Sequence, residues 1–365
     1  MPYFQYKNIK IAAIASAVPT NVVRSTDFND KFTAEGVEKF VGMTGVREHR
    51  ATGEHQTASD LGYAAAEKIL TEKNVDRNSI GAVIFGAHST DYRRPATACV
   101  LHKRLGLGKE CAAFDVSLGC SAFVYCIQAA AAMMQCSNID KALVIVGETM
   151  TKMVNENDKS AVMLFGDAGA AALLEKTEDA CEIKGLLRSD GNGYRAIIAP
   201  AGGFRNMTAS DEPMLWQDGN PRTLYNTNMN GTDVFAFTIS DVPRAIKDFL
   251  KISETTIEDY DCYAMHQANQ FIHKQLAKKL KMNVDKMPLC LDRYGNTSAP
   301  AIPLTLCDAY GECSEEREMN VLMCGFGVGL SWGVFSARIN TADIYPIIET
   351  DEYFAEGIIN SPEDM

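Results

Sequence analysis

Short apolar runs alternate along this chain with longer segments in which apolar residues recur every three or four positions. Runs that are apolar on both faces are typical of buried strands, and the periodic segments are typical of helices packed on a sheet. Strands are predicted at Ile9–Ala17, Ala82–Gly86, Ala112–Val116, Ala142–Val146, Ala161–Phe165, Asp261–Met265, Leu289–Asp292, Asn320–Cys324 and Ser331–Ala337, and helices at Ala58–Glu72, Ser121–Gln135, Asp241–Lys251 and Gln270–Leu280. This alternation predicts an α/β fold built in layers.

The order of these elements occurs twice along the chain. In each half the order is a strand, a polar turn and a helix, then a strand, a Gly- or Asn-containing turn and a helix, and then two strands. We interpret this order as an internal duplication, in which Cys120 and Asn296 occupy matching turns. The alternative is the ordinary order of elements in any α/β protein. The polar stretch 174–183 divides the halves, so the predicted units are 1–178, 179–340 and a C-terminal segment 341–365.

The charge of the chain changes which partners are expected. The net charge of −12 argues against nucleic acid or an anionic membrane, because both require clustered positive charge. Seven acidic residues and no Lys or Arg fall within 341–365. We expect this segment to be a solvated tail, with a docking device as the alternative.

The eleven cysteines are scattered, odd in number and contain no Cys-x-x-Cys pair. Such a distribution is typical of reduced thiols, so a cytoplasmic location is expected rather than a disulfide framework. No His/Cys cluster has the spacing of a zinc site, and we expect neither a metal nor a cofactor. The N-terminus lacks the pattern of a signal peptide, and no apolar stretch is long enough to span a membrane.

Cys120 is the first candidate for chemistry. It follows the predicted strand Ala112–Val116 and a short turn with Gly119, and it stands where the next helix begins. The N–H groups and the positive dipole end of a helix favour a thiolate, and the same N–H groups can bind an oxyanion. This placement predicts a nucleophile with a lowered pKa, whereas most cysteines in a chain of this kind are inert and buried.

His266 and Asn296 complete a candidate constellation. His266 directly follows a short apolar strand, and the ends of such strands are where α/β sheets meet their ligands. Asn296 lies in a Gly-Asn-Thr turn, which alone indicates only a turn. The order Cys, His, Asn also occurs in papain-like proteases, but the sequence around a protease cysteine of that type is absent here.

Six motifs together give the chain a resemblance to a known family. It resembles ketoacyl-acyl-carrier-protein synthase III, one of the thiolase-like condensing enzymes, from Lys10 to Ile339. The motifs are TGVREHR (Thr44–Arg50), FDVSLGCSAFVY (Phe114–Tyr125), LFGDAGAAAL (Leu164–Leu173), HQANQ (His266–Gln270), YGNTSAPAIP (Tyr294–Pro303) and GFGVGLSWG (Gly325–Gly333). The resemblance implies a duplicated five-layer α-β-α-β-α fold without a cofactor.

The resemblance also implies a reaction. The residue that matches Cys120 takes an acyl group from acyl-CoA, and those that match His266 and Asn296 donate hydrogen bonds to the thioester of a malonyl group on acyl carrier protein. Loss of CO₂ then yields the carbanion that attacks the acyl-cysteine. The N–H groups of Cys120 and Val328 would hold the resulting oxyanion. Glycine is usual at the position of Val328.

Several positions depart from the family pattern. Lys39 and Met43 stand where a Trp and an Arg often contact the CoA adenine. Arg94 stands where the family often has a Phe that reaches the acyl pocket of the partner subunit, which implies a homodimer and a small or polar acyl group. The alternative is that Arg94 turns away to an acidic residue at the surface.

A basic helix face is the remaining candidate. Lys274, Lys278 and Lys281 recur at helical spacing and are candidates for binding acyl carrier protein, or simply a solvated face. Two other activities stay open for the whole chain: acyl transfer to a hydroxyl or amine without decarboxylation, and a non-catalytic partner of a condensing enzyme.

Overall fold

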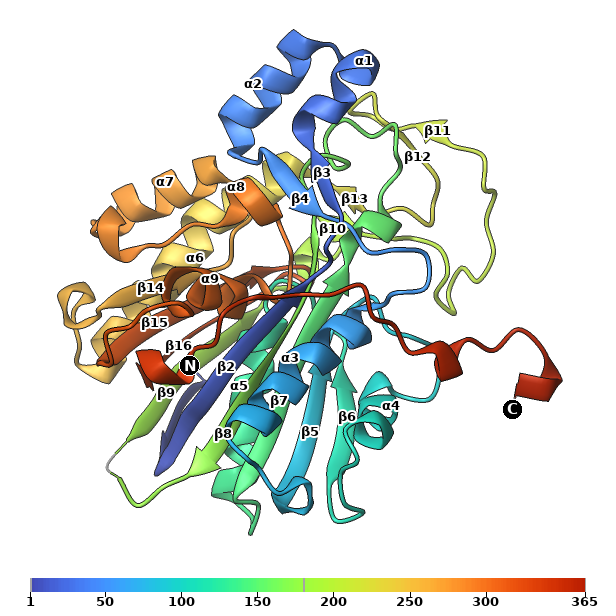
Figure 1. Cartoon of the computed structure of the whole chain (residues 1–365). Helices are drawn as coiled ribbons and strands as arrows, with labels where there is room; N and C mark the ends of the chain where they lie inside the picture. Colours follow the sequence, from blue (N-terminus) through green and yellow to red (C-terminus); the bar gives the residue numbers. More distant parts are fainter. Residues whose placement is uncertain (1, 180, 365) are drawn as a thin grey trace.

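The computed structural model describes residues 2–179 and 181–364, so Ala180 within the predicted boundary 174–183 lies outside the described part. Two sheets form the body (Figure 1). The six-stranded sheet has the order β17 (Ile348–Glu349), β2 (Ile9–Val18), β8 (Asp167–Lys176), β7 (Lys141–Thr149), β5 (Ile80–Gly86), β6 (Ala112–Val116). The five-stranded sheet has the order β1 (Tyr3–Lys7), β9 (Glu182–Ser189), β16 (Ser331–Asn340), β15 (Glu318–Gly327), β14 (Cys262–Met265).

The two sheets share an arrangement of strands. In the first, β8 is antiparallel to both β2 and β7, and β7 is parallel to β5. In the second, β9, β16 and β15 repeat this pattern, and β15 is parallel to β14. The match supports the proposed duplication, although β1 and β17 each join the sheet of the other half.

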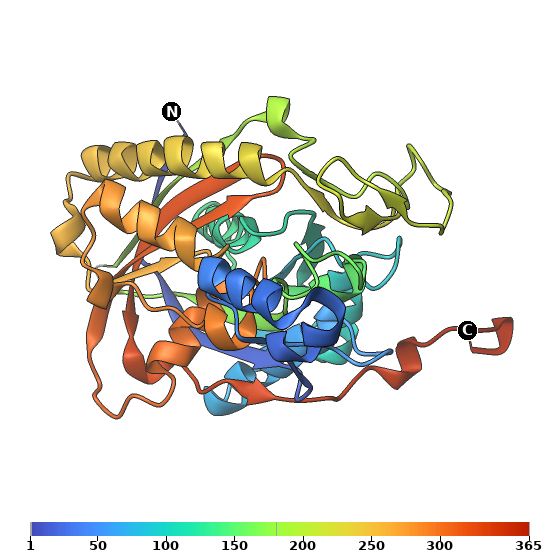
Figure 2. The ribbon, with the colours of Figure 1, turned by 90° about the horizontal axis from the view of Figure 1, so that it is seen from above.

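Helices form the remaining layers (Figures 1 and 2). In chain order they are α1 (Asn29–Phe32), α2 (Ala34–Thr44), α3 (Ala58–Glu72), α4 (Thr97–Arg104), α5 (Ala122–Gln135), α6 (Gly231–Ser253), α7 (Gln270–Leu280), α8 (Leu291–Tyr294) and α9 (Ala301–Tyr310). Helices α3 and α4 cover the outer face of the first sheet, whereas α6 covers that of the second, with α7 against it. Helices α5 and α9 lie between the sheets, which completes the five layers.

Short two-stranded ribbons lie outside the two main sheets. They pair β3 (Val22–Arg24) with β4 (Glu48–Arg50), β10 (Ile197–Ile198) with β13 (Asn228–Met229), and β11 (Met214–Leu215) with β12 (Pro221–Arg222). The last two belong to a long excursion between β9 and α6, which supplies part of the wall of the central cavity. In the described residues no helix is long and apolar enough to cross a membrane.

Two predicted strands are wrong, and local hydrogen bonds explain both. The run 161–165 forms turns, because the N–H of Val162 donates to the carbonyl of Asp158 and that of Phe165 to the carbonyl of Ala161. Most of its apolar side chains are buried although the run is not a strand of either main sheet. The run 289–292 leads into α8 instead. The side-chain oxygen of Gln267 accepts the N–H of Leu291 (2.9 Å) and of the preceding residue (3.1 Å), where a sheet neighbour would otherwise be needed.

The acidic segment after residue 340 is not simply solvated, contrary to the expectation. Strand β17 pairs with β2, and Ile344 is buried. Further along, the N–H of Phe354 donates to Asp60 on α3 (2.9 Å), and the guanidinium of Arg104 lies between the rings of Tyr63 and Phe354 (4.3 and 4.7 Å).

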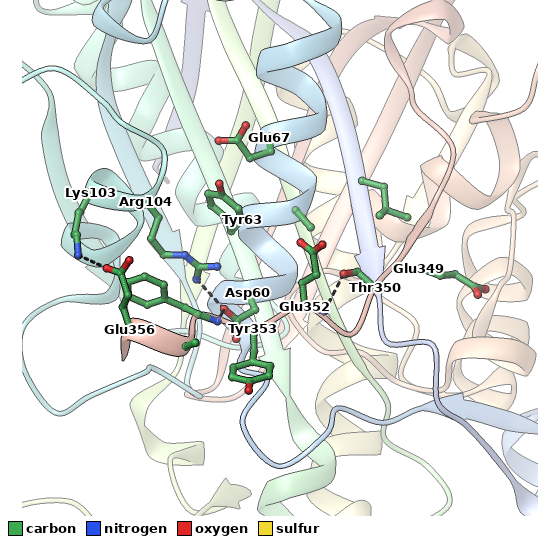
Figure 3. A pocket seen from close by; sticks show the side chains of 14 residues that line it. Asp60, Tyr63, Glu67, Lys103, Arg104, Glu349, Thr350, Glu352, Tyr353 and Glu356 are labelled. Carbon is green, nitrogen blue, oxygen red and sulfur yellow. Dashed lines mark hydrogen bonds and ion pairs between the residues drawn. The ribbon is translucent and has the colours of Figure 1, made fainter. Parts of the chain in front are cut away.

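Figure 3 shows the resulting groove between the segment and the body, with Lys103 paired to Glu356 (2.9 Å). Several acidic side chains of the C-terminal segment contact residues of the body: Glu349 contacts Arg50, Asp343 contacts Lys73, and Asp351 contacts Thr20. The last part of the chain, toward the end marked C, runs away from the body in both overall views.

Candidate active site

Cys120 lies between a strand and a helix and faces a cavity. Strand β6 ends at Val116, the N–H of Ala122 donates to the carbonyl of Gly119 (2.7 Å), and α5 begins at Ala122. The cavity has a volume of about 550 Å³, and Cys120, His266 and Asn296 all line it. The structure therefore brings together the three residues that the sequence singled out.

A glycine allows the end of β15 to reach the nucleophile. A Cβ added at Gly327 would lie 2.7 Å from the Cβ of Cys120 and 3.0 Å from its Sγ, closer than side chains tolerate. The following residue, Val328, also lines the cavity, and its backbone N–H faces the Sγ of Cys120 together with that of Cys120 itself. Two N–H groups that converge on one sulfur form the kind of site that stabilises an oxyanion on an attached acyl group.

Asn296 is held by the turn that precedes β8. Its N–H donates to the carbonyl of Leu164 (2.8 Å), and its carbonyl accepts the N–H of Gly166 (3.2 Å). Gly295 has a φ of +65°, and a Cβ there would lie 2.7 Å from the carbonyl oxygen of Leu164. The LFGD and YGNT motifs thus fit together through their backbones. The carboxamide oxygen of Asn296 accepts the N–H of Ser298 (3.0 Å), which leaves its NH₂ group as the donor for the cavity.

His266 follows β14 and is neutral in its surroundings. Its backbone N–H donates to the carbonyl of Cys324 (2.8 Å), and the centre of its ring lies 5.2 Å from that of Phe326, edge to face. Burial and the nearby His273 lower the pKa of His266 to about 3, although the backbone of Ser298 acts in the opposite direction. A neutral imidazole can donate one hydrogen bond, as an enolate-stabilising role requires.

The acidity predicted for Cys120 is wrong in direction. Burial raises the pKa of its thiol to about 11, above the ordinary value of 9.0. The Ser298 hydroxyl, 3.4 Å from Sγ, and the two facing backbone N–H groups lower the pKa only in part. The position at the start of α5 was visible in the sequence, but the depth of the site was not, and desolvation of the thiolate outweighs the donors.

The other predicted residues lie outside this cavity. Arg94 is exposed, and it does not line the cavity of its own chain. Lys274, Lys278 and Lys281 are exposed at the surface of α7 and just after it. In the described part of the chain no group of three or more His, Cys, Asp or Glu could hold a metal ion.

Sequence reasoning missed three residues of the site. The hydroxyl of Ser298 contacts the nucleophile, and its φ of +60° is unusual for a residue other than glycine. His88 and Thr227 line the cavity from distant segments. His88 follows a predicted strand, which was the one available signal, whereas Thr227 lies in a polar excursion without a motif.

Comparison with known proteins agrees with this geometry. The family model of 3-oxoacyl-[acyl-carrier-protein (ACP)] synthase III matches residues 114–191, and the model of its C-terminal part matches residues 250–339. A beta-ketoacyl-[acyl-carrier-protein] synthase III of Clostridium beijerinckii is 33% identical over 325 residues, which cover 89% of this chain and 97% of the relative. Its counterpart in Caldanaerobacter subterraneus is 32% identical over 323 residues, 88% of this chain and 95% of the relative.

A solved structure extends the comparison to the whole fold. The crystal structure of 3-oxoacyl-(acyl-carrier protein) synthase from Burkholderia xenovorans has a TM-score of 0.90 and 33% identity, and the match covers 96% of this chain and 99% of that one. Sequence and architecture thus agree over nearly the full length. The chain belongs to the 3-oxoacyl-[acyl-carrier-protein] synthase III family, condensing enzymes with the thiolase-like fold.

Proposed function

We propose that this protein joins a short acyl group to the malonyl group of malonyl-acyl carrier protein, with loss of CO₂, through an acyl thioester on Cys120. The observation that carries the proposal is the convergence of Cys120, His266 and Asn296 on one cavity, with two backbone N–H groups aimed at the sulfur. The names of the relatives, which refer to synthases acting on acyl carrier protein, support the same reaction.

In the first half-reaction the sulfur of Cys120 attacks the carbonyl carbon of the acyl donor. The bond from that carbon to the donor sulfur breaks, and the donor leaves as a thiol with the proton that Cys120 gives up. Because burial holds the pKa of Cys120 near 11, the free thiol is the resting form. The hydroxyl of Ser298 and the two backbone N–H groups then stabilise the sulfur as its charge develops.

In the second half-reaction the malonyl group loses its carboxylate as CO₂, and the electron pair of the broken bond forms an enolate. The imidazole N–H of His266 and the side-chain NH₂ of Asn296 stabilise the enolate oxygen. The enolate carbon attacks the acyl group on Cys120, and the N–H groups of Cys120 and Val328 hold the tetrahedral oxyanion. Collapse breaks the bond to sulfur and releases the 3-oxoacyl product on its carrier. The Cys120 thiolate that leaves takes a proton from solvent to restore the thiol.

Acyl carrier protein is acidic in its usual form, so a basic surface would suit it. We propose that it docks on α7 at Lys274, Lys278 and Lys281, whose side chains are exposed. Lys274→Glu with Lys278→Glu should raise the KM for malonyl-acyl carrier protein and leave acylation by acyl-CoA unchanged. The matched change Lys247→Glu on the exposed face of α6 should alter neither value. A double variant with an unchanged KM would contradict this docking site.

We further propose a homodimer in which Arg94 reaches the acyl pocket of the partner, and a division into two duplicated halves near residue 178. The exposure of Arg94 supports the first, and the matching strand orders support the second. A cytoplasmic location is proposed because all eleven cysteines are free thiols. Light scattering that gives a monomer at micromolar concentration would count against the dimer.

Two measurements on one preparation test the reaction. Intact-protein mass should show one acyl group on the wild type after incubation with acyl-CoA or acyl-carrier thioesters, and none on Cys120→Ala. Release of CO₂ from malonyl-acyl carrier protein should then follow. Acylation without CO₂ release would favour transfer to a hydroxyl or amine, and neither event with any donor would favour a non-catalytic partner.

A further inference from the structure

Besides the Nδ1 of His266, which belongs to the proposed catalytic set, two polar atoms on residues that line the cavity beside Cys120 have no partner in the described part of the chain. The Nε2 of His88 and the Oγ1 of Thr227 are buried, and no described residue forms a hydrogen bond with either. Both residues line the cavity, and Thr227 is only 8% exposed. Buried polar atoms without a partner cost free energy, and natural proteins keep few of them. In a substrate cavity such atoms indicate polar atoms on the ligand.

Both side chains are held in place through their backbones. The N–H of His88 donates to the carboxylate of Glu148 (2.9 Å) at the end of β7. A Cβ added at Gly119 would lie 2.9 Å from the Cδ2 of His88, so the imidazole rests against the residue before the nucleophile. The N–H of Thr227 donates to the carbonyl of Met153 (2.8 Å). Both residues are therefore anchored in the wall of the cavity.

The rest of the cavity shows which polar group would fit. Its wall is otherwise mainly apolar, with Met150, Phe165, Ile198 and Met229 among its members. None of the described residues that line it is Lys, Arg, Asp or Glu. An anionic acyl group would therefore meet no compensating cation in the described wall of the cavity. The ligand group is thus polar but neutral.

We propose that His88 and Thr227 select an acyl donor whose chain carries a neutral oxygen substituent, a hydroxyl or an oxo group, over a plain alkyl chain. The inference rests on the proposed function, because acylation of Cys120 is what places the chain in this cavity. A hydroxyl can donate to or accept from either group, and an oxo oxygen can accept from either when that group carries the proton. The substituent takes no part in bond making: the donor thioester bond breaks and the Cys120 thioester forms as before.

The test measures kcat/KM for acylation of Cys120 by intact-protein mass, with chains presented both on CoA and on acyl carrier protein. The chains are 3-hydroxybutyryl (each enantiomer), acetoacetyl, butyryl, succinyl and acetyl. At least one oxygen-substituted four-carbon chain should acylate the wild type at least about tenfold faster than butyryl, since a cavity that pairs its polar atoms with a substituent discriminates against the chain that lacks it. Succinyl should be slower than the preferred neutral chain.

Three variants separate the inference from the reaction. Thr227→Val removes the hydroxyl at constant shape, and His88→Leu removes the imidazole; each should lower the preference over butyryl at least about threefold. Thr208→Val, the same change at an exposed position of the same excursion, should keep the wild-type preference. If the wild type shows no preference, if succinyl is preferred, or if neither cavity variant changes the ratio, the inference fails while acylation by acetyl or butyryl still supports the proposed function. If no chain acylates folded protein, both fail.

Discussion

The hydroxyl of Ser298 lies 3.4 Å from the sulfur of Cys120. The same serine donates its backbone N–H to the carboxamide of Asn296, so a single residue connects the nucleophile with a donor of the second half-reaction. Its φ of +60° places the hydroxyl at this junction. The contact makes Ser298 the first position at which the proposed chemistry can be tested.

Ser298→Gly should slow the reaction of Cys120 with iodoacetamide at pH 8 several-fold. The hydroxyl lowers the pKa of a thiol that burial holds near 11, so its loss leaves even less thiolate at that pH. Glycine suits the positive φ, which separates loss of the hydroxyl from backbone strain. Peptide mapping follows Cys120 alone, and the exposed Cys313 serves as the internal reference. An unchanged rate at Cys120 would show that Ser298 does not stabilise the thiolate.

Asn296→Ala should reduce decarboxylation of malonyl-acyl carrier protein by about a hundredfold or more, because it removes one of two donors to the enolate. Acylation of Cys120 should fall much less, by the amount that looser placement of Ser298 causes. Single-turnover assays of the two half-reactions give both rates, with exposed Asn157→Ala as the matched control. Equal losses in both steps would mean that Asn296 maintains the shape of the site and does not stabilise an enolate.

Gly327→Ala should nearly abolish acylation of Cys120 in folded protein. The new methyl group would stand 2.7 Å from the Cβ of Cys120, so either the sulfur or the end of β15 must move. Overpacking of this kind costs about 1–3 kcal/mol of stability. Gly191→Ala, where no atom lies within 4 Å of the added group, should keep both activity and Tm. Wild-type acylation in the Gly327 variant would show that the sulfur is mobile.

His273 should make the protein less stable as the pH falls. Burial lowers its pKa to about 4, against about 6.5 in the unfolded chain, so the unfolded state binds more protons between these values. The stabilisation is therefore complete above about pH 6.5 and is lost as the pH falls toward 4, by about 1.4 kcal/mol per pH unit. His273→Gln should flatten the dependence by that amount in urea unfolding at pH 6 and pH 5. A slope equal to that of the wild type would contradict the shift.

Removal of residues 358–365 should leave Tm and acylation of Cys120 unchanged, whereas removal of 341–365 should lower Tm strongly or prevent folding. The longer deletion takes away β17 and buried Ile344, and it leaves Asp60 and Arg104 without the Phe354 contacts. Differential scanning fluorimetry gives the first comparison and intact-protein mass the second. A stable protein without 341–365 would mean that the segment is as dispensable as its composition suggests.

The sequence predicts the long elements of this fold well. The bounds of α3 and α7 agree with the prediction, since both have a helical period over three or more turns. Helix α6 begins at Gly231, ten residues earlier than predicted, because its first turns are rich in β-branched and aromatic residues and Pro243 lies inside it. Short apolar runs do not distinguish a strand from other buried structure. The run 161–165 forms turns, and in the run 289–292 the side chain of Gln267 accepts the N–H groups of Cys290 and Leu291.

The site was predictable only where its residues belong to local motifs. Cys120, His266 and Asn296 each follow a strand or a glycine turn, so their context is visible in the sequence. Thr227 reaches the cavity only because the excursion after β9 folds back against Met153. The pKa of Cys120 likewise depends on how deeply the assembled layers bury it, and no local pattern encodes that depth.

The edge strands β1 and β17 have a consequence for how the molecule unfolds. Each comes from one end of the chain and completes the sheet formed mainly by the other half, while α5 and α9 contribute one apolar core to both sheets. Neither half can then lose its structure without exposing the core of the other. The duplicated halves are therefore a single cooperative unit, and calorimetry should record one heat-absorption peak rather than two.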